Sequence, residues 1–282
     1  MNKKLTQKIA FMIFRILGLL IVGLLFWILG FIVYNGIGVI NWEFLTSYPK
    51  NGMTEGGIFP AIIGTVCLII GSMVIAFPLG VMSAIYTTEY AKKGWIVKII
   101  RVMTNNMAGI PSIVFGLFGM ALFVNTMKFG DSIIAGSLTL GLLVLPIIIR
   151  TTEEALQSIP DSFRTGSLAL GASKIQTIWR VILPMATPKI MTGLILSIGR
   201  VSGETAPILF TVAAYFLPKL PNSIFDQVMA LPYHLYVLAT SGTDIEASKP
   251  IAYGTALVFI VFMMNMLATV LRNYLNNKVK TD

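Results

Sequence analysis

Charged residues are scarce in this sequence of 282 residues, since Asp, Glu, Lys and Arg together make up 12% of it. An average soluble domain is about one-quarter charged. Hydrophobic residues make up 56%, which is more apolar surface than a water-soluble fold of this length can hide but which a lipid bilayer accepts. The composition therefore excludes a water-soluble fold and predicts a polytopic membrane protein.

Cysteine and histidine are nearly absent. Cys67 is the only cysteine and His234 the only histidine, so no intrachain disulfide can form and no cluster has metal-ligand spacing. His234 is expected in an extramembrane loop, and the two residues are weak candidates for a nucleophilic site. The sequence also lacks the Gly-x-x-x-x-Gly-Lys-Ser/Thr loop that holds ATP. We therefore expect no catalytic residue, no metal and no cofactor on this chain.

Long apolar runs are what the sequence does contain. Each is near or above the ~20 residues that a helix needs to cross the hydrocarbon layer. The first run, residues 16–33, is longer than the core of a cleaved signal peptide and is interpreted as a retained span. Hydropathy thus predicts an all-α fold with six membrane spans, at about residues 12–34, 58–87, 99–126, 132–152, 189–214 and 251–271.

The basic residues predict the orientation of the spans. The formal net charge is +9, and cytoplasmic loops of membrane proteins are rich in Lys and Arg. If the N-terminus is cytoplasmic, 16 of the 21 basic residues fall in inside segments, four fall in outside loops and Arg200 remains. The inside set includes Lys92, Lys93 and Lys280. Both termini are therefore expected in the cytoplasm, and the positive charge requires no nucleic-acid partner.

Small residues recur at every fourth position in two of the spans. The third span carries Ala108, Ser112 and Gly116, and the fourth carries Ser137 and Gly141. Such spacing places small side chains on one face of a helix, where they allow a neighbouring helix to approach closely. We expect these faces to pack against other helices.

The longest inside loop, residues 153–188, is predicted to hold two short helices. The first runs from about 161 to 170, begins after Pro160 and ends at Gly171 in a left-handed conformation. Ser173 then opens the second, with Gln176 three residues later completing a capping box. Pro184 is expected to end it.

The second loop helix is amphipathic. Its apolar residues fall at helical spacing and form one stripe, made of Ile175, Ile178, Trp179 and Ile182. A stripe of this kind suits either a hairpin that lies on the bilayer or a helix that docks into the groove of a cytoplasmic partner. The pattern alone leaves both alternatives open.

A charged pair interrupts the fifth predicted span. Arg200 lies about 17 Å beyond Lys189 on a helix that rises 1.5 Å per residue, which places it near mid-membrane. Glu204 follows one turn later on the same face. A charge buried alone in the bilayer is costly, so the two are expected to neutralise each other. Glu89, at the inner end of the second span, is expected instead to be a solvated carboxylate.

Polar groups accompany this pair on the predicted helix. Ser197 and Thr211 fall in the same sector as the pair, and Pro207 leaves the carbonyl of Gly203 without its helical donor. One interpretation is a water-accessible path for an anion, because the planar fork of Arg can donate to two oxygens at once. The other is a buried ion pair that holds two helices in register.

Residues 171–184, with the sequence GASKIQTIWRVILP, resemble the EAA loop of ABC importer permeases. Gly171, Leu183 and Pro184 fit that motif, and Val181 takes the place of its Ile. The Glu-Ala-Ala positions differ, since residues 165–167 read Thr-Gly-Ser. In this family the loop inserts into a groove of the ATPase subunit, so the resemblance favours docking over a hairpin on the bilayer.

Four further stretches, in the same order, resemble phosphate-transport permeases of the PstA type. They are residues 56–65 (GGIFPAIIGT), 84–91 (AIYTTEYA), 108–119 (AGIPSIVFGLFG) and 199–207 (GRVSGETAP). Together with the loop, these stretches cover about residues 55–275. The EAA loop alone would indicate only an ABC importer permease.

The resemblance implies a type I ABC importer permease with a MetI-like fold that moves inorganic phosphate into the cytoplasm by alternating access. Residues 1–56 would form an N-terminal tail, first span and outer loop, residues 57–275 the permease core, and residues 276–282 a cytoplasmic tail. Its partners would be a second permease of the PstC type, an ATPase dimer of the PstB type that binds ATP and Mg, and an extracytoplasmic phosphate-binding protein.

The resemblance also implies functional positions in this sequence. The substrate path would include Ser197, Arg200, Glu204, Thr205, Pro207 and Thr211. The ATPase-coupling loop would use Gly171, Ala172, Ser173, Lys174, Leu183 and Pro184. A permease for another oxyanion, such as molybdate or sulfate, is the nearest alternative. An ion-coupled secondary transporter or a membrane-anchored signalling protein is a more distant one.

Overall fold

The computed structural model describes residues 3–91, 94–240 and 245–279, and almost all of the regular structure in them is helical. Lys92, Lys93 and Lys280, and the end of the predicted tail at 276–282, lie outside the described residues. The longer helices are α1 (Lys3–Gly36), α3 (Phe59–Ile85), α4 (Trp95–Ala108), α6 (Ile133–Gln157), α9 (Leu183–Ser202), α11 (Leu231–Thr240) and α12 (Ile245–Val279).

Shorter elements connect these helices. The helical ones are α2 (Trp42–Thr46), α5 (Ser112–Gly119), α7 (Asp161–Ala169), α8 (Lys174–Thr177), α10 (Ala206–Thr211) and the single turn η1 (Asn51–Met53). Three π-helical segments extend longer helices: η2 (Tyr86–Tyr90), η3 (Met120–Thr126) and η4 (Ile178–Ile182). The strands β1 (Pro49–Lys50) and β2 (Glu55–Gly56) pair antiparallel in a small outer hairpin.

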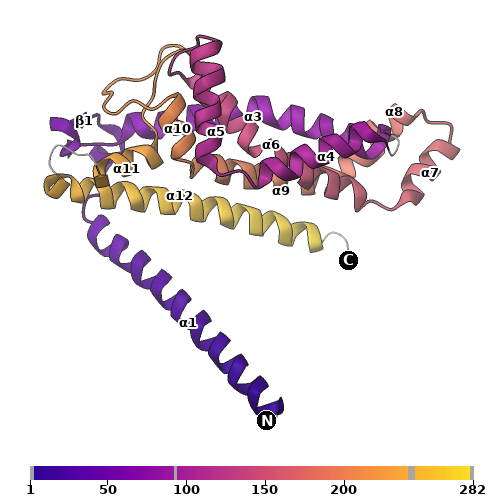
Figure 1. Cartoon of the computed structure of the whole chain (residues 1–282), viewed down its shortest axis with the longest axis horizontal. Helices are drawn as coiled ribbons and strands as arrows, with labels where there is room; N and C mark the ends of the chain where they lie inside the picture. Colours follow the sequence, from indigo (N-terminus) through magenta and orange to yellow (C-terminus); the bar gives the residue numbers. More distant parts are fainter. Residues whose placement is uncertain (1–2, 92–93, 241–244, 280–282) are drawn as a thin grey trace.

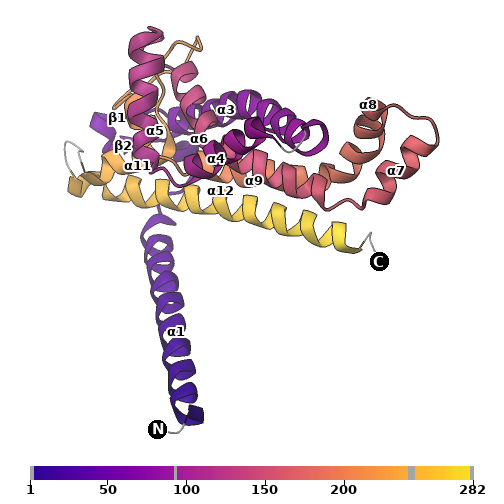
Figure 2. The same cartoon turned by 45° about the vertical axis from the view of Figure 1, so that its right-hand side comes forward.

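Five helices in the described residues are long and apolar enough to cross a membrane, or up to six if a bent pair counts as one span. This confirms the predicted polytopic all-α fold. The long helices α3, α6, α9 and α12 run lengthwise, with α7 and α8 at one end and the β hairpin at the other (Figure 1). Helix α1 diverges from this bundle in both views (Figures 1 and 2).

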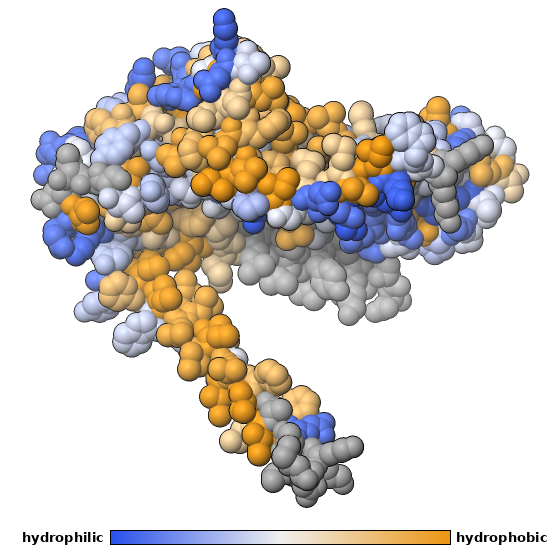
Figure 3. Space-filling view, viewed as in Figure 1, coloured by the Kyte–Doolittle hydropathy of each residue, from blue (hydrophilic) through white to orange (hydrophobic). Residues whose placement is uncertain are grey.

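The apolar surface follows this arrangement. Along α1 every residue of the most apolar window is unburied in the chain, and hydrophobic side chains cover α1 and the middle of the body (Figure 3). Hydrophilic side chains gather toward the ends of the molecule in the same view. Helix α1 rejoins the body at Phe31, whose ring meets that of Tyr253 on α12 edge to face with centroids 5.6 Å apart.

The third predicted span, 99–126, is broken in the structure. In the structure α4 and α5 meet at an angle of 107°, and α5 stands crosswise to the long helices (Figure 1). The break falls at Gly109, Ile110 and Pro111. A proline has no N–H to donate and disfavours the helical conformation of the residue before it, which explains why the helix stops at this point.

The fifth predicted span, 189–214, is also wrong as one helix, because α9 ends at Ser202 and α10 begins at Ala206. Gly203 takes the C-cap position of α9. Pro207 lies in the first turn of α10, where a missing N–H costs nothing because that N–H has no helical acceptor. Pro207 therefore starts a helix, and the expectation that it frees the carbonyl of Gly203 within a continuous helix is wrong.

The sequence predicted that Pro184 ends the second loop helix, and this prediction is wrong. The helix continues from Lys174 to Ser202 through the π-helical segment η4. In that segment the N–H of Leu183 bonds the carbonyl of Ile178, five residues back. A π-turn displaces the hydrogen-bond ladder by one residue, so a proline directly after it is tolerated.

The body is held together by close contact between α3 and α6. A side chain at Gly71 of α3 would overlap Ser137 of α6, and one at Gly80 would lie 2.6 Å from Ile148. The close packing predicted for Ser137 is thus confirmed. Gly116 of α5 packs in the same way on α10, where a Cβ would lie 3.0 Å from the Cα of Pro207. The last contact joins the two broken spans to each other.

Candidate functional site

Arg200 and Glu204 form the predicted ion pair, with the Arg200 Nε 2.8 Å from the Glu204 Oε1. Arg200 lies in the last turn of α9, where the free carbonyls of a helix end favour a cation. Glu204 lies in the break that follows. The Glu204 side chain is 9% exposed and that of Arg200 is 51% exposed. The carboxylate is therefore held inside the chain while the guanidinium extends out of it.

A cavity of about 160 Å³ lies beside Arg200. It is the place where the broken third span, helix α6 and the end of α9 meet. Arg200 is the one charged residue among its lining residues, which are Met107, Ile110, Phe115, Leu143, Pro146, Ile147 and Arg200. Arg200 is therefore the group of this lining that could attract an anion, although Glu204 already pairs with its Nε.

The residues whose hydroxyls were predicted to lie with the pair, Ser197 and Thr211, do not line this cavity. Ser197 is fully buried and its hydroxyl donates to the carbonyl of Gly193 at 2.9 Å. Thr211 is fully buried on α10, and its hydroxyl donates to the carbonyl of Pro207 at 2.7 Å. Both hydroxyls are thus hydrogen-bonded within their own helices. The prediction that Ser197 and Thr211 share one polar face of a single helix is wrong, because the helix breaks between them.

Thr205 and Pro207 lie at the start of α10, with Thr205 partly exposed and Pro207 buried. Neither lines the cavity. The role of these residues in a path therefore stays a prediction. The apolar lining residues were missed from the sequence, although Pro111 and Pro146 signal that the third and fourth spans are irregular at this depth.

The loop at residues 153–188, predicted to be cytoplasmic, has the predicted local structure at its turn. The Ser173 hydroxyl accepts from the Gln176 N–H at 3.3 Å, and the Gln176 side chain accepts from the Ser173 N–H at 2.8 Å, which confirms the capping box. Gly171 has φ +85, the left-handed conformation expected at the end of a helix. Helix α7 ends one residue before the predicted position, at Ala169.

The predicted apolar stripe of the loop is divided in two. Ile178 and Ile182 are 2% and 0% exposed and belong to the core, whereas Ile175 and Trp179 are 61% and 55% exposed. The π-helical segment η4 widens the helix within the stripe, so its residues no longer share one face. Exposed apolar side chains thus remain on the loop and include Leu170, which is 90% exposed.

The remaining residues predicted for coupling lie along the same loop. Ala172 and Leu183 are partly buried and Pro184 is exposed. Lys174 places its ammonium group 5.0 Å from the centre of the Tyr90 ring, which is within the range of a cation–π contact. The loop therefore touches the end of the second span through Lys174.

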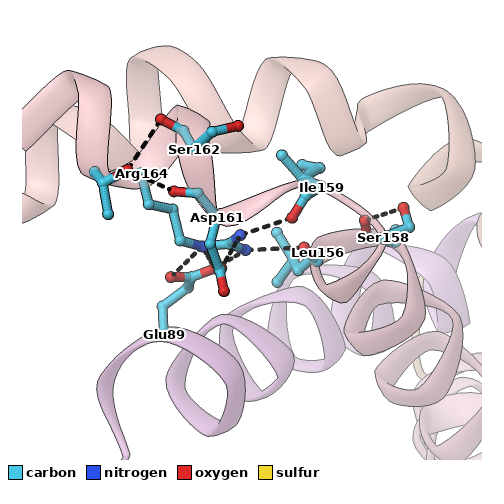
Figure 4. A network of polar contacts seen from close by, with 9 residues as sticks. Glu89, Leu156, Ser158, Ile159, Asp161, Ser162 and Arg164 are labelled. Carbon is cyan, nitrogen blue, oxygen red and sulfur yellow. Dashed lines mark hydrogen bonds and ion pairs between the residues drawn. The ribbon is translucent and has the colours of Figure 1, made fainter.

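Glu89 is not the solvated carboxylate that the sequence predicted. Its side chain is 7% exposed, and its Oε1 accepts from the Arg164 Nη2 at 2.7 Å (Figure 4). The two residues are 75 positions apart, so no local pattern signals the pair. His234 also differs from expectation, since it lies buried on α11 rather than in a loop, and both ring nitrogens lack a partner among the described residues.

The comparison with known sequences identifies the family. Residues 76–281 match the family described as binding-protein-dependent transport system inner membrane component. The probable ABC transporter permease protein YqgI of Bacillus subtilis (strain 168) is 33% identical over 100% of both chains. The phosphate transport system permease protein PstA of Yersinia pestis is 38% identical, over 88% of this chain and 83% of its own. The PstA of Mycobacterium leprae is 36% identical, over 93% and 86%.

Solved structures share the fold. A chain of a bacterial alginate ABC transporter, in complex with an alginate pentasaccharide-bound periplasmic protein, matches with a TM-score of 0.67 at 14% identity, over 96% of both chains. A chain of the MetNI methionine ABC transporter in an inward-facing conformation matches with a TM-score of 0.55 at 18% identity, over 77% of this chain and 94% of its own. The ABC importer permease fold expected from the resemblance is therefore confirmed, and the chain belongs to the family of binding-protein-dependent transport system inner membrane components.

Proposed function

We propose that this chain is the non-catalytic permease subunit of an ATP-driven importer that moves inorganic phosphate into the cytoplasm. The observation that carries the proposal is Arg200, held by Glu204 at a helix break and exposed beside a cavity that has no other charged lining residue. The names of the PstA relatives support phosphate as the substrate. A guanidinium suits phosphate because it can donate to two oxygens at once.

Helix breaks support a transport role for this region. The break between α4 and α5 supplies Ile110 to the cavity wall, and the break after α9 holds Glu204. In secondary transporters the substrate meets interrupted helices near the middle of the bilayer, because free backbone groups and helix ends are available there, and we propose the same use of the breaks here. Ser197, Thr205, Pro207 and Thr211 do not line the cavity and would support the path rather than contact the anion.

The half-exposed guanidinium also indicates that a second permease completes the site. One guanidinium cannot replace the hydration shell of a phosphate, and an exposed Arg within a bilayer is costly unless it faces water or protein. We propose that a PstC-type permease covers this side of Arg200. An extracytoplasmic phosphate-binding protein would deliver the anion, and both termini of this chain would lie in the cytoplasm.

ATP would be bound and hydrolysed, with Mg, by a PstB-type ATPase dimer. We propose that this dimer receives the loop from α7 to the start of α9. Exposed apolar side chains there, such as Leu170 and Trp179, fit helix-in-groove recognition. The turn at Gly171–Lys174 would shape the docking surface, and Leu183 and Pro184 would connect it to α9.

Reconstituted complexes test the proposal. In proteoliposomes that contain the permease pair, the ATPase and the binding protein, we expect phosphate to be imported and to stimulate ATP hydrolysis, whereas sulfate and molybdate do neither. The Arg200→Gln variant should lose phosphate uptake and still retain the ATPase on purification. Lys249→Gln, which removes an exposed charge outside the cavity, is the control. Normal phosphate uptake by Arg200→Gln, or uptake of another oxyanion by the wild type, would contradict the proposal.

A further inference from the structure

A single arginine joins three parts of the cytoplasmic side. Arg164, on α7, donates to the Glu89 carboxylate through Nη2 at 2.7 Å and through Nε at 3.2 and 3.3 Å. It also donates to the carbonyls of Leu156 and Ile159, both at 2.9 Å, and to the Asp161 carboxylate at 3.1 Å. Figure 4 shows these groups converging on the guanidinium. The contacts engage all of its nitrogens.

The carbonyl of Leu156 belongs to the last turn of α6, and that of Ile159 lies two residues beyond the end of this helix. The last carbonyls of a helix have no partners within the helix, and a cation placed there also interacts favourably with the helix dipole. Arg164 therefore caps α6 with a side chain from α7. The same helix carries Leu143, Pro146 and Ile147 to the wall of the cavity beside Arg200. A movement of Arg164 thus acts on the helix that lines the candidate path.

The carboxylate belongs to the end of the second span. Glu89 lies in the π-helical segment η2, which continues α3. Its neighbours make contacts with the same region: the Thr87 hydroxyl donates to the buried Glu153 of α6, and the Tyr90 ring receives Lys174. Segment η2 thus meets α6, α7 and α8 within one turn. Segments of π-helix frequently occur at functional sites.

Helix α7 has little else to hold it. None of its residues is buried, and it contributes nothing to the apolar cluster beneath the loop, which is built from Ile85, Ala155, Leu156, Ile159, Ile178, Ile182, Ala186 and Ile190. Its other tie within the loop is the bond between Ser167 and Thr177 at 2.9 Å. Arg164 therefore links α7 to the membrane body, through the Glu89 carboxylate and through the carbonyls of Leu156 and Ile159. The pair Glu89 and Arg164 is called the coupling clamp below.

We propose that Arg164 is a positioning residue, and that the coupling clamp transmits movement of the docking loop to α3 and α6 during transport. This inference rests on the proposed function. The two carboxylates that accept from Arg164 differ in burial, and this difference allows an experiment to distinguish transmission of movement from an ordinary surface ion pair. Glu89 is 7% exposed and Asp161 is 90% exposed, so loss of Glu89 leaves Arg164 without its buried partner, while loss of Asp161 removes a contact that water can replace.

The test is the number of phosphate ions imported per ATP hydrolysed by the reconstituted complex. Glu89→Gln and Arg164→Gln should lower this ratio about tenfold, equivalent to about 1.4 kcal/mol, while the ATPase stays bound and hydrolysis stays within about twofold. Asp161→Asn, the matched control, should keep the wild-type ratio. Arg164→Lys should be intermediate, because it keeps the charge but loses the planar fork.

A second measurement does not depend on phosphate. Cys67 lies on α3 and is the only cysteine of the chain, so a thiol reagent reports on that helix when the partner subunits are free of cysteine. We expect ATP to change the rate of Cys67 labelling in the wild type and in Asp161→Asn, but not in Arg164→Gln.

Three results would overturn the inference. They are an unchanged transport ratio in Arg164→Gln, an equal loss in Asp161→Asn, and a decrease of hydrolysis and uptake in parallel with the amount of assembled complex. The last result would assign the clamp a purely structural role. A wild type that imports an oxyanion other than phosphate contradicts the proposed function alone, because the ratio for that oxyanion and the Cys67 labelling still test the clamp.

Discussion

Arg200 and Glu204 face each other across the end of a helix, with the Arg200 Nε 2.8 Å from the Glu204 Oε1 although Glu204 lies beyond the last residue of α9. The two side chains, four residues apart, still meet although α9 ends between them. The carboxylate is buried and the guanidinium is half exposed. Glu204 thus neutralises Arg200 within the chain while leaving donors of the guanidinium free to meet an anion.

Removing the Glu204 charge should change phosphate handling in a characteristic way. In Glu204→Gln the guanidinium is no longer neutralised, so it should hold an anion more tightly and release it more slowly. We expect the KM for phosphate uptake to decrease about tenfold, equivalent to about 1.4 kcal/mol, and the maximal rate to decrease as well. Initial uptake rates over a range of phosphate concentrations measure both. A higher maximal rate, or a higher KM, would contradict this role of Glu204.

The close approach at Gly64 predicts a stability effect. A Cβ at this position of α3 would overlap the backbone carbonyl of Met229, and backbone atoms cannot move aside as a side chain can. Gly64→Ala should destabilise the chain by about 1–3 kcal/mol, the usual cost of overpacking. The melting temperature of the purified complex measures the effect. Gly23→Ala, at a helical position with nothing within 4 Å, should leave it unchanged.

The left-handed turn at Gly171 predicts an effect on ATPase binding. Its φ is +85, and a Cβ there would meet no atom within 4 Å, so Gly171→Ala acts through backbone conformation alone. Such a conformation costs a non-glycine residue about 1–2 kcal/mol. We expect less ATPase to co-purify and slower uptake.

Gly166→Ala is the matched control for Gly171→Ala. Gly166 lies within α7 with open space around it, and alanine favours a helix there. This variant should bind the ATPase at least as well as the wild type. Equal loss of binding in both variants would show that the turn is not what the ATPase requires.

The buried His234 predicts a dependence of stability on pH. Burial lowers the pKa of its imidazole from 6.5 to about 4, and α11 is outside the candidate spans. Between these values the unfolded chain binds a proton that the folded chain excludes. The free energy of unfolding should therefore decrease as the pH falls from about 6.5 to about 4, by on the order of 3 kcal/mol.

The non-titrating variant His234→Leu isolates this contribution. The difference in melting temperature between the variant and the wild type should shift in favour of the variant as the pH falls through this window, by roughly 2–4 °C for each kcal/mol. Measurements at pH 7.5 supply the reference, because His234 is neutral in both states there. A difference that does not vary with pH would contradict the burial of a neutral imidazole.

Two segments show how far local patterns predict the structure. The capping box of Ser173 and Gln176 formed as predicted because its partners are three residues apart. The end of α9 was missed even though Gly203 and Pro207 are ordinary signals of a helix end and a new start. The apolar run from 189 to 214 predicts one span, because hydropathy does not indicate whether the helix within an apolar run is continuous.

The sequence by itself determined the membrane class, the approximate spans, the pairing of Arg200 with Glu204 and the two short helices of the loop at residues 153–188. All of these depend on composition or on residues within one turn of each other. Only the tertiary structure decided that two helix breaks meet at a cavity beside Arg200, that His234 is buried, and that Glu89 pairs with Arg164. The physical reason is that these contacts join helices distant in the chain, and helix packing selects which residues become neighbours.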